Sequence, residues 1–506
     1  MRIMKLKKLA LRRPLLNFLT VTANLFLILF ALQSNINAQV AGDISDKAIT
    51  DALETHLLLE ESVPTHKIDI TTTDGVVTLS GEVDNLLAKQ RATDVATTLR
   101  GVRAVINSIV VDPRPRLDQQ IKQDINRALL EDPAVEVADL KISVKDGVVH
   151  LGGIVASRQE KNLAADVSAG ITGVRDVNNQ IAIEYSIERS DEEIEKDILR
   201  RLESDIWVDE GFIQVEVTDG EVVLAGTVGS LAEKRSARSD AWVIGVIEVY
   251  SEDLEVNWAF RDSLQRKRKY APVDSEKLAQ AVEDALFYDP RVDEDDVEVY
   301  VQDHSVTLSG TVNSLRGRKA AYSDAQNTTG VMRVYNHLRV RPNEIPENSV
   351  LEDRIRASFG RDPYVDLFEI RVSVVNGKAF LDGRVNNSFE SRRAENLASS
   401  VNGVVDVVNM IDYEYAYDPK PDWELAQDIR DMIFWNPLLT EQGLTIEVND
   451  GVVRLDGEVD SWIEFFEAEE IAFKVGAKDV RNHLEISNLS LYRTPTERFM
   501  IGSDDL

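Results

Sequence analysis

The chain has 506 residues, with 57 basic side chains, 88 acidic side chains and a formal net charge of −31. A field of this sign repels nucleic acid, so DNA and RNA binding are set aside. The absence of cysteine excludes disulfides, thiolate metal sites and a catalytic cysteine, and it suits an oxidising compartment without proving one.

The N-terminal segment, 1–38, has the order of a secretory signal peptide. Six basic residues lie in the first 13 positions, an apolar stretch runs from Leu15 to Leu32, and a short segment ends in Ala38. An uncleaved inner-membrane anchor is the alternative, because about 18 apolar residues nearly span a bilayer. Both interpretations predict a protein outside the cytoplasm, in a Gram-negative periplasm. Cleavage after Ala38 would remove six basic and no acidic residues, which gives a net charge of −37.

The stretch DGVVTLSGEV at 74–83 is the first of six related stretches, which begin at 74, 146, 219, 303, 376 and 450. Each stretch has a turn position and, six positions later, a middle glycine. A third glycine follows the middle glycine after 19 or 20 positions. Successive middle glycines are separated by steps of 72, 73, 84, 73 and 74 along the chain. The structural glycines are Gly75, Gly147, Gly220, Gly377 and Gly451 at the turn; Gly81, Gly153, Gly226, Gly310, Gly383 and Gly457 in the middle; and Gly101, Gly173, Gly245, Gly330, Gly403 and Gly476 at the third position. Such regularity indicates six copies of one small domain.

The first repeat shows how each domain is built. Ile49, Ala52, Leu53 and Leu57 are spaced for one face of a helix. Alternating residues on both sides of an Asp-Gly pair then predict a hairpin with a type I′ turn. A second helical pattern leads to Gly101, a candidate C-cap, and a third strand follows.

The predicted order is therefore α-β-β-α-β, in an α+β fold with two helices packed on a three-stranded mixed sheet. We expect His304, which replaces the turn glycine in the fourth repeat, to use a different turn. An asparagine six positions after the third glycine in five repeats is interpreted as a local turn or strand-start residue. The predicted segments are a signal peptide at 1–38, repeats at 43–113, 115–187, 190–258, 274–342, 347–416 and 421–491, a basic linker at 259–273 and a C-terminal tail at 492–506.

The motif D-G-V-V-x-L-x-G-x-V between two helices, followed by G-V-x-x-V-x-N, resembles the BON domain, named for bacterial osmotically inducible and nodulation proteins. The resemblance covers nearly all of the chain after about residue 43. It implies an exported or envelope-associated module that interacts with phospholipid and keeps the envelope intact under osmotic stress. It implies no catalytic motif, and its glycines are fold residues.

The linker contains the only dense basic run of the mature chain. Aromatic residues beside such a run can lie at a lipid interface while the cations meet phosphate. The alternative is a solvated linker whose cations pair with acidic domains. The candidate lipid-contact residues are Trp258, Arg261, Arg266, Lys267, Arg268, Lys269 and Tyr270.

No catalytic or metal-binding motif stands out, so the sequence predicts no cofactor, no metal and no enzyme. Two functions are open. The first is a periplasmic envelope protein that binds phospholipid peripherally and supports the envelope under stress. The second is a periplasmic adaptor or scaffold for a protein or peptidoglycan partner. The sequence leaves the ligand, the binding repeat and the oligomeric state open.

Overall fold

The computed structural model describes residues 44–135, 139–185, 187–260, 274–293, 296–413, 420–439 and 443–486. The six repeats belong to one compact unit that begins at Asp46. The predicted leader, residues 261–273 of the linker and the C-terminal tail lie outside the described residues. In the part of the chain that is described, no helix is long and apolar enough to cross a membrane.

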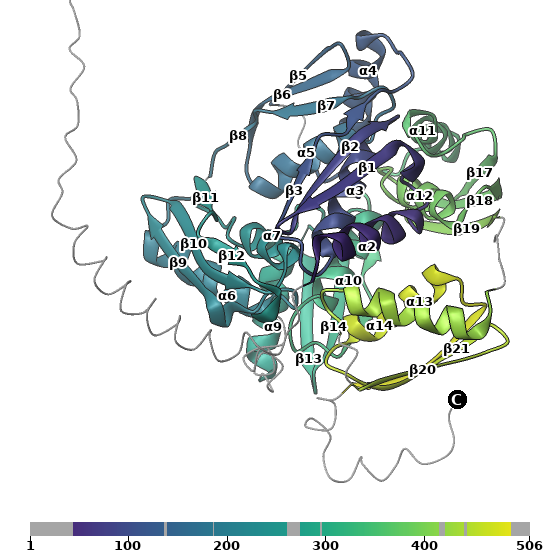
Figure 1. The fold of residues 1–506 in the computed structure, drawn as a ribbon. Helices are drawn as coiled ribbons and strands as arrows, with labels where there is room; N and C mark the ends of the chain where they lie inside the picture. The colour runs from purple at the N-terminus through teal and green to yellow at the C-terminus, as the bar shows by residue number, and fades with distance from the viewer. Residues whose placement is uncertain are drawn as a thin grey trace, which may run out of the picture. The chain divides into compact units, whose positions relative to one another are not determined.

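Every repeat has the predicted order of elements, and Figure 1 shows each pair of helices with its sheet. Repeat 1 contains α2 (Asp46–Leu58), β1 (Ile68–Thr73), β2 (Val76–Val83), α3 (Leu86–Thr98), β3 (Ala104–Asn107) and β4 (Val110–Val111). Repeat 2 contains α4 (Asp118–Glu131), β5 (Leu140–Lys145), β6 (Val148–Val155), α5 (Arg158–Ala169), β7 (Asp176–Asn179) and β8 (Ala182–Ile183). Repeat 3 contains α6 (Asp191–Ser204), β9 (Ile213–Thr218), β10 (Glu221–Val228), α7 (Leu231–Asp240), β11 (Glu248–Tyr250) and β12 (Leu254–Val256).

The second half of the chain has the same elements. Repeat 4 contains α9 (Ser275–Phe287), β13 (Val297–Gln302), β14 (Ser305–Val312), α10 (Leu315–Gln326), β15 (Arg333–Asn336) and β16 (Arg339–Val340). Repeat 5 contains α11 (Asn348–Arg361), β17 (Ile370–Val375), β18 (Lys378–Val385), α12 (Ser388–Ser399) and β19 (Asp406–Tyr413). Repeat 6 contains α13 (Asp422–Trp435), β20 (Leu444–Asn449), β21 (Val452–Val459), α14 (Trp462–Val475) and β22 (Asp479–Ile486).

The sheets are mixed, as predicted. The second strand is central, antiparallel to the first strand and parallel to the third. In repeat 1, Gly81 of the central strand is the partner of Ile68, and Val76 is the partner of Ala104. The third strand is split in two in the first four repeats and continuous in β19 and β22. The α+β fold, with two helices on each small mixed sheet, is confirmed.

All six hairpins use the turn that the Asp-Gly pair predicts. In repeat 1, φ is 50° at Asp74 and 72° at Gly75, and a type I′ turn requires positive values at both positions. In repeat 4, φ is 48° at Asp303 and 61° at His304, and the strand register is the same as in the other repeats. The expectation of a different turn at His304 is therefore wrong. Histidine tolerates this conformation better than most residues, and His304 Nδ1 lies 3.0 Å from the carbonyl oxygen of Gly330.

A carboxylate of the first helix holds this turn in place. Asp46 Oδ2 accepts a hydrogen bond from the N–H of Asp74, and Oδ1 accepts one from the N–H of Gly75, both at 2.9 Å. The sequence analysis did not identify this acceptor, whose spacing to the turn is constant. The equivalent acceptors in repeats 2, 3 and 6 are Asp118, Asp191 and Asp422.

The core of each repeat lies between the helices and one face of the sheet. In repeat 1, Ile49, Leu53 and Leu57 of α2 are buried, and so are Val77 and Leu79 of β2. The predicted apolar stripe of the first helix is confirmed. Because these residues lie on one face, the opposite face of the sheet is left outside this core.

Two local details refine the prediction. Gly101 is not the C-cap of its helix: α3 ends at Thr98 with Leu99 as its C-cap, whereas Gly476 does cap α14 with φ of 117°. The repeated asparagine has a structural role. Asn107 donates from its amide to the carbonyl of Lys89 at 2.9 Å and accepts from the N–H of Ile109 at 3.0 Å, which ties α3 to the third strand.

Two adjacent glycines in β6 provide a test of the middle position. Gly153 has φ of +117°, and a Cβ there would lie 2.1 Å from the carbonyl oxygen of Asp139, whereas a Cβ at Gly152 would meet nothing within 4 Å. We expect Gly153→Ala to destabilise repeat 2 by at least about 2 kcal/mol, because a side chain at positive φ is strained and the neighbouring strand must also move. Gly152→Ala is the matched control and should cost less than about 1 kcal/mol. Hydrogen exchange of β5 and β6 measures both effects, and equal losses would contradict this role of the middle glycine.

Candidate functional site: the joints between repeats

Of the predicted lipid-contact residues, the structure describes Trp258. Trp258 lies in a short 3-10 helix, Trp258–Phe260, and is half-buried. The remaining candidates, Arg261, Arg266, Lys267, Arg268, Lys269 and Tyr270, lie outside the described residues.

The described residues instead show polar sites where repeats meet. A polar side chain follows the first helix of each repeat, 21 positions before the middle glycine. In repeat 2, Asp132 Oδ1 accepts a hydrogen bond from the N–H of Ala134 at 3.0 Å. This bond fixes the loop that leaves the helix. The residues at this position are Glu60, Asp132, Asp205, Asp289, Asp362 and Asn436.

Repeats 2 and 5 are joined by two reciprocal backbone bonds. The N–H of Thr172 donates to the carbonyl of Arg361 at 2.8 Å, and the N–H of Asn402 donates to the carbonyl of Glu131 at 3.2 Å. Each acceptor is the last residue of a first helix, whose carbonyl has no partner inside the helix. Each donor directly precedes a third glycine. Because the two bonds are equivalent, the joint has the character of a two-fold interface.

The same type of bond pairs the other repeats. Arg100 of repeat 1 donates to the carbonyl of Trp435 in repeat 6 at 3.3 Å, and Thr329 of repeat 4 donates to the carbonyl of Ser204 in repeat 3 at 2.8 Å. Both acceptors are again the last residues of first helices. The pairing order is therefore 1 with 6, 2 with 5, and 3 with 4.

Ion pairs reinforce these joints. Arg361 donates to Glu131 at 2.5 Å between repeats 5 and 2, and its side chain is only 7% exposed. Lys474 of repeat 6 pairs with Glu60 of repeat 1, which also binds Arg91 at 2.8 and 2.9 Å. Burial opposes ionisation of Glu60, but the bonds to Arg91 and Lys474 outweigh it and lower its pKa. Partners on two repeats thus hold one carboxylate in its charged form.

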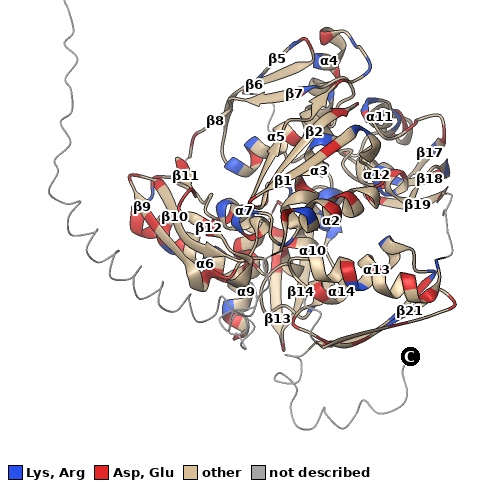
Figure 2. Ribbon diagram, viewed as in Figure 1, with Lys and Arg blue, Asp and Glu red and all other residues tan. Residues whose placement is uncertain are grey.

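A second type of contact joins the second helices of other repeats. Arg235 of α7 donates to Asp94 and Thr97 of α3, at 2.8 and 3.1 Å. Lys319 of α10 makes the equivalent contacts with Glu395 and Ser399 of α12, at 2.7 and 3.1 Å. Repeats 3 and 1 are thereby joined in the same manner as repeats 4 and 5. In Figure 2, basic and acidic residues are interspersed on these helices.

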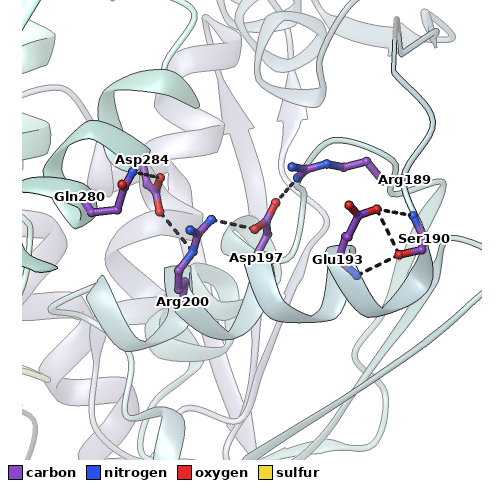
Figure 3. Close-up of polar contacts among 7 residues, drawn as sticks. All are labelled: Arg189, Ser190, Glu193, Asp197, Arg200, Gln280 and Asp284. Carbon is purple, nitrogen blue, oxygen red and sulfur yellow. Dashed lines mark hydrogen bonds and ion pairs between the residues drawn. The ribbon is translucent and has the colours of Figure 1, made fainter.

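The joint between repeats 3 and 4 contains a row of alternating charges. Figure 3 shows Arg200 between two aspartates, donating to Asp197 on its own helix α6 at 2.7 Å and pairing with Asp284 of α9 at 3.3 Å. Arg189 pairs with the other side of Asp197. This alternation of charges links the two first helices.

Two aspartates at this joint have strongly perturbed pKa values. Burial, together with the neighbouring carboxylate of Asp205, raises the pKa of Asp240 well above its usual value. Burial and the neighbouring carboxylate of Asp289 do the same for Asp324. The sequence analysis missed these residues, although only the third and fourth repeats have an aspartate 14 positions after the middle glycine.

The joints can bind and orient, but they do not form a recognisable catalytic arrangement. Among the described residues, no group of three or more histidine or acidic side chains could hold a metal ion. The polar groups instead satisfy helix ends and neutralise one another across the joints.

Comparisons with known proteins agree with the repeat architecture. The BON domain family model matches residues 45–113, 117–185, 190–257, 274–342, 347–415 and 421–488. Osmotically-inducible protein Y of Escherichia coli K12 is 28% identical over 159 residues, which are 30% of this chain and 78% of that protein. Outer membrane lipoprotein DolP of Haemophilus influenzae is 30% identical over 146 residues, which are 28% of this chain and 75% of that protein. The C-terminal domain of CdsD from Chlamydia trachomatis aligns with 42% of this chain and all of that domain, at 16% identity and a TM-score of 0.12, and it carries no argument.

The buried joint between repeats 2 and 5 predicts a large effect of Arg361→Met. This change leaves Glu131 without its cation. We expect the free energy of unfolding to fall by about 3 kcal/mol, because breaking a buried ion pair leaves an uncompensated buried charge. Arg371→Met is the control, since Arg371 is 82% exposed and pairs with Asp382 on the surface, where a pair contributes less than about 1 kcal/mol. Chemical denaturation with limited proteolysis measures the difference. Similar losses in the two variants would show that the joint does not stabilise the protein.

The joint between repeats 1 and 6 should weaken in acid. Burial lowers the pKa of His56 from 6.5 to about 4, and the charge of Lys474 acts in the same direction. As the pH falls, the unfolded chain is therefore protonated at His56 before the folded chain is. The contribution of His56 to stability is complete above about pH 6.5 and decreases as the pH drops toward 4. The loss amounts to about 3 kcal/mol at most.

Unfolding free energies between pH 7 and 4.5 test this dependence. We expect His56→Gln to flatten the pH dependence, and His66→Gln, at an exposed position, to leave it unchanged. An unaltered slope in His56→Gln would contradict the assignment.

Proposed function

Because this chain belongs to the BON domain family, with six copies of the domain, we propose that it is an exported, non-enzymatic protein of the cell envelope. In this proposal it contacts phospholipid membrane peripherally and supports the envelope under osmotic or other stress. The relatives support this setting, since one is named as osmotically inducible and another as an outer membrane lipoprotein. The leader pattern at 1–38 supports export to the periplasm.

An exposed face of the sheet in repeat 4 supports a contact with a membrane. Tyr300 of β13 and Tyr335 of β15 are both partners of Thr307, so they lie in one row across the sheet. Their side chains are 61% and 42% exposed. Tyrosine suits a membrane interface, because its ring is apolar and its hydroxyl is polar.

Positive charge accompanies this aromatic row. Arg333 is exposed and lies over the ring of Tyr335 at 5.9 Å, and Arg339 is exposed on the next strand segment. Repeat 4 directly follows the basic linker at 259–273 along the chain. The aromatic row with its arginines is the observation that carries the proposal, since it pairs interfacial rings with cations that can meet phosphate.

The net negative charge restricts where a membrane can be contacted. A mature chain with a charge of −37 is repelled by anionic lipid unless a local basic surface makes the contact. The linker and the outer sheet face of repeat 4 are the proposed surface. The same charge is the observation that favours the second candidate, a periplasmic adaptor that binds a protein or peptidoglycan partner.

Liposome flotation of the mature chain, residues 39–506, tests the lipid proposal. We expect flotation with vesicles that contain anionic lipid. We expect at least about tenfold weaker binding when Arg266, Lys267, Arg268 and Lys269 are changed to glutamate, since each cation contributes about 1 kcal/mol at an anionic surface. Absence of flotation in wild type would favour the adaptor function.

A matched variant distinguishes a local contact from a general charge effect. It changes four exposed lysines of repeats 2 and 3 to glutamate, so the net charge changes by the same amount away from the linker. We expect this control to bind nearly as well as wild type, and an equal loss would contradict a site in the linker. The control positions are Lys122, Lys141, Lys145 and Lys196.

A further inference from the structure

A cavity of about 420 Å³ lies between repeats 2, 3 and 4. Its volume is within the range of small-molecule sites in proteins. The walls come from helices α5, α6, α7, α9 and α10 and the loops that follow them. The proposed lipid contact makes no use of this cavity.

The cavity contains two equivalent pairs of carboxyl groups. Asp205 and Asp240 of repeat 3 are in hydrogen-bond contact, and so are Asp289 and Asp324 of repeat 4. In each pair, one residue is 21 positions before the middle glycine and the other is 14 positions after it. The pairs are therefore counterparts across the joint between repeats 3 and 4.

Each pair has one arginine bound to it. Arg201 donates to Asp240 Oδ1 at 3.0 Å, and Arg291 donates to Asp289 through Nε at 2.8 Å. One positive charge stands against two carboxyl groups in each pair. Each pair therefore has one carboxyl group without a matching cation. Elsewhere on its wall, Arg200 pairs with Asp284 and Arg316 pairs with Asp132, whereas the exposed Asp166 has no ion-pair partner among the described residues.

Asp240 and Asp324 both line the cavity, and the Oδ2 atom of each is buried. Asp240 is 7% exposed, and its Oδ2 has no N–H or hydroxyl donor among the described residues, as is also true of Asp324 Oδ2. The group that each aspartate contacts is another carboxyl, which is an acceptor unless a proton lies between the two. A buried oxygen that lacks a hydrogen bond lowers the stability of the folded chain. A proton shared by the two carboxyl groups of a pair would supply the missing donor, which is consistent with the raised pKa values of Asp240 and Asp324.

We propose that this cavity binds a small linear organic diammonium compound, with one ammonium group at each aspartate pair. An ammonium carries one positive charge and three donors, so it can replace the shared proton and bridge both carboxylates of a pair. Two such groups neutralise both unmatched charges. Arg201 binds Asp240 of one pair, and its charge also acts on Asp324 of the other pair.

The chemistry of the walls favours a diammonium over a metal ion. The acidic groups lie in two separate pairs, and among the described residues no three such groups gather in a geometry that could hold a metal. Apolar parts of Leu163, Ala281 and Ala285 also line the cavity and can contact an aliphatic stem. A divalent metal concentrates its charge at one point, whereas a diammonium divides it between two.

Isothermal titration calorimetry of the full mature chain tests the proposal. The probes are straight-chain diamines with two to six carbons, with butylamine and Mg²⁺ as comparisons. We expect one diamine to bind per chain, at least about tenfold more tightly than butylamine, which corresponds to about 1.4 kcal/mol. Absence of binding by every diamine at millimolar concentration would overturn the proposal, as would equal binding by butylamine or Mg²⁺.

The double variant Asp240→Asn and Asp324→Asn identifies the site. Asparagine keeps the shape of a protonated aspartic acid and its donor, so the fold should persist, which circular dichroism and thermal unfolding check. We expect a loss of diamine affinity of at least about tenfold. The control makes the same aspartate-to-asparagine change at two exposed positions, Asp69→Asn and Asp253→Asn. An equal loss in the control, or an unchanged affinity in the cavity variant, would overturn the assignment.

Discussion

The left-handed hairpin turn and the strand register that it fixes are the constraint on which the other features depend. Asp74 and Gly75 at positive φ start a central strand whose residues alternate strictly. A shift of one residue would move Val77 and Leu79 away from the helices. The carboxylate of Asp46 holds the turn from the first helix, so the register and the helix position are set together. Asparagine, aspartate or even histidine can occupy the turn because each tolerates this backbone.

The ends of the first helices then determine how the repeats meet. A helix leaves its last carbonyl groups without internal partners, and at Glu131 and Arg361 a backbone N–H of another repeat supplies one. The donors directly precede a third glycine, a position where the chain has already left its second helix. These bonds pair repeats 1 with 6, 2 with 5, and 3 with 4. The six domains are thus connected by specific contacts and not only by linkers.

Charge at these joints has two consequences. Where an acid meets a cation, as Glu131 meets Arg361, the two charges neutralise each other across the joint. Where the acids exceed the cations, as at Asp240 and Asp324, a polar cavity retains capacity for a proton or a cationic group. Differences among six similar domains are therefore concentrated where they meet, and a site can arise from a single aspartate on a second helix.

The sequence by itself determined the number of repeats, the order of their elements, the α+β fold and the hairpin turns of every repeat except the fourth. These features are local: each depends on the spacing of apolar residues and on glycine or aspartate at a fixed turn position. The sequence also placed a basic linker at 259–273, whose role stays a prediction. Only the tertiary structure decided which repeats pair and which acids become unmatched neighbours. Asp240 belongs to an ordinary polar helix pattern, and its contact with Asp205, 35 positions earlier in the chain, follows from packing and not from spacing. Contacts between repeats depend on complementary surfaces far apart in the chain, and no periodicity in the sequence records them.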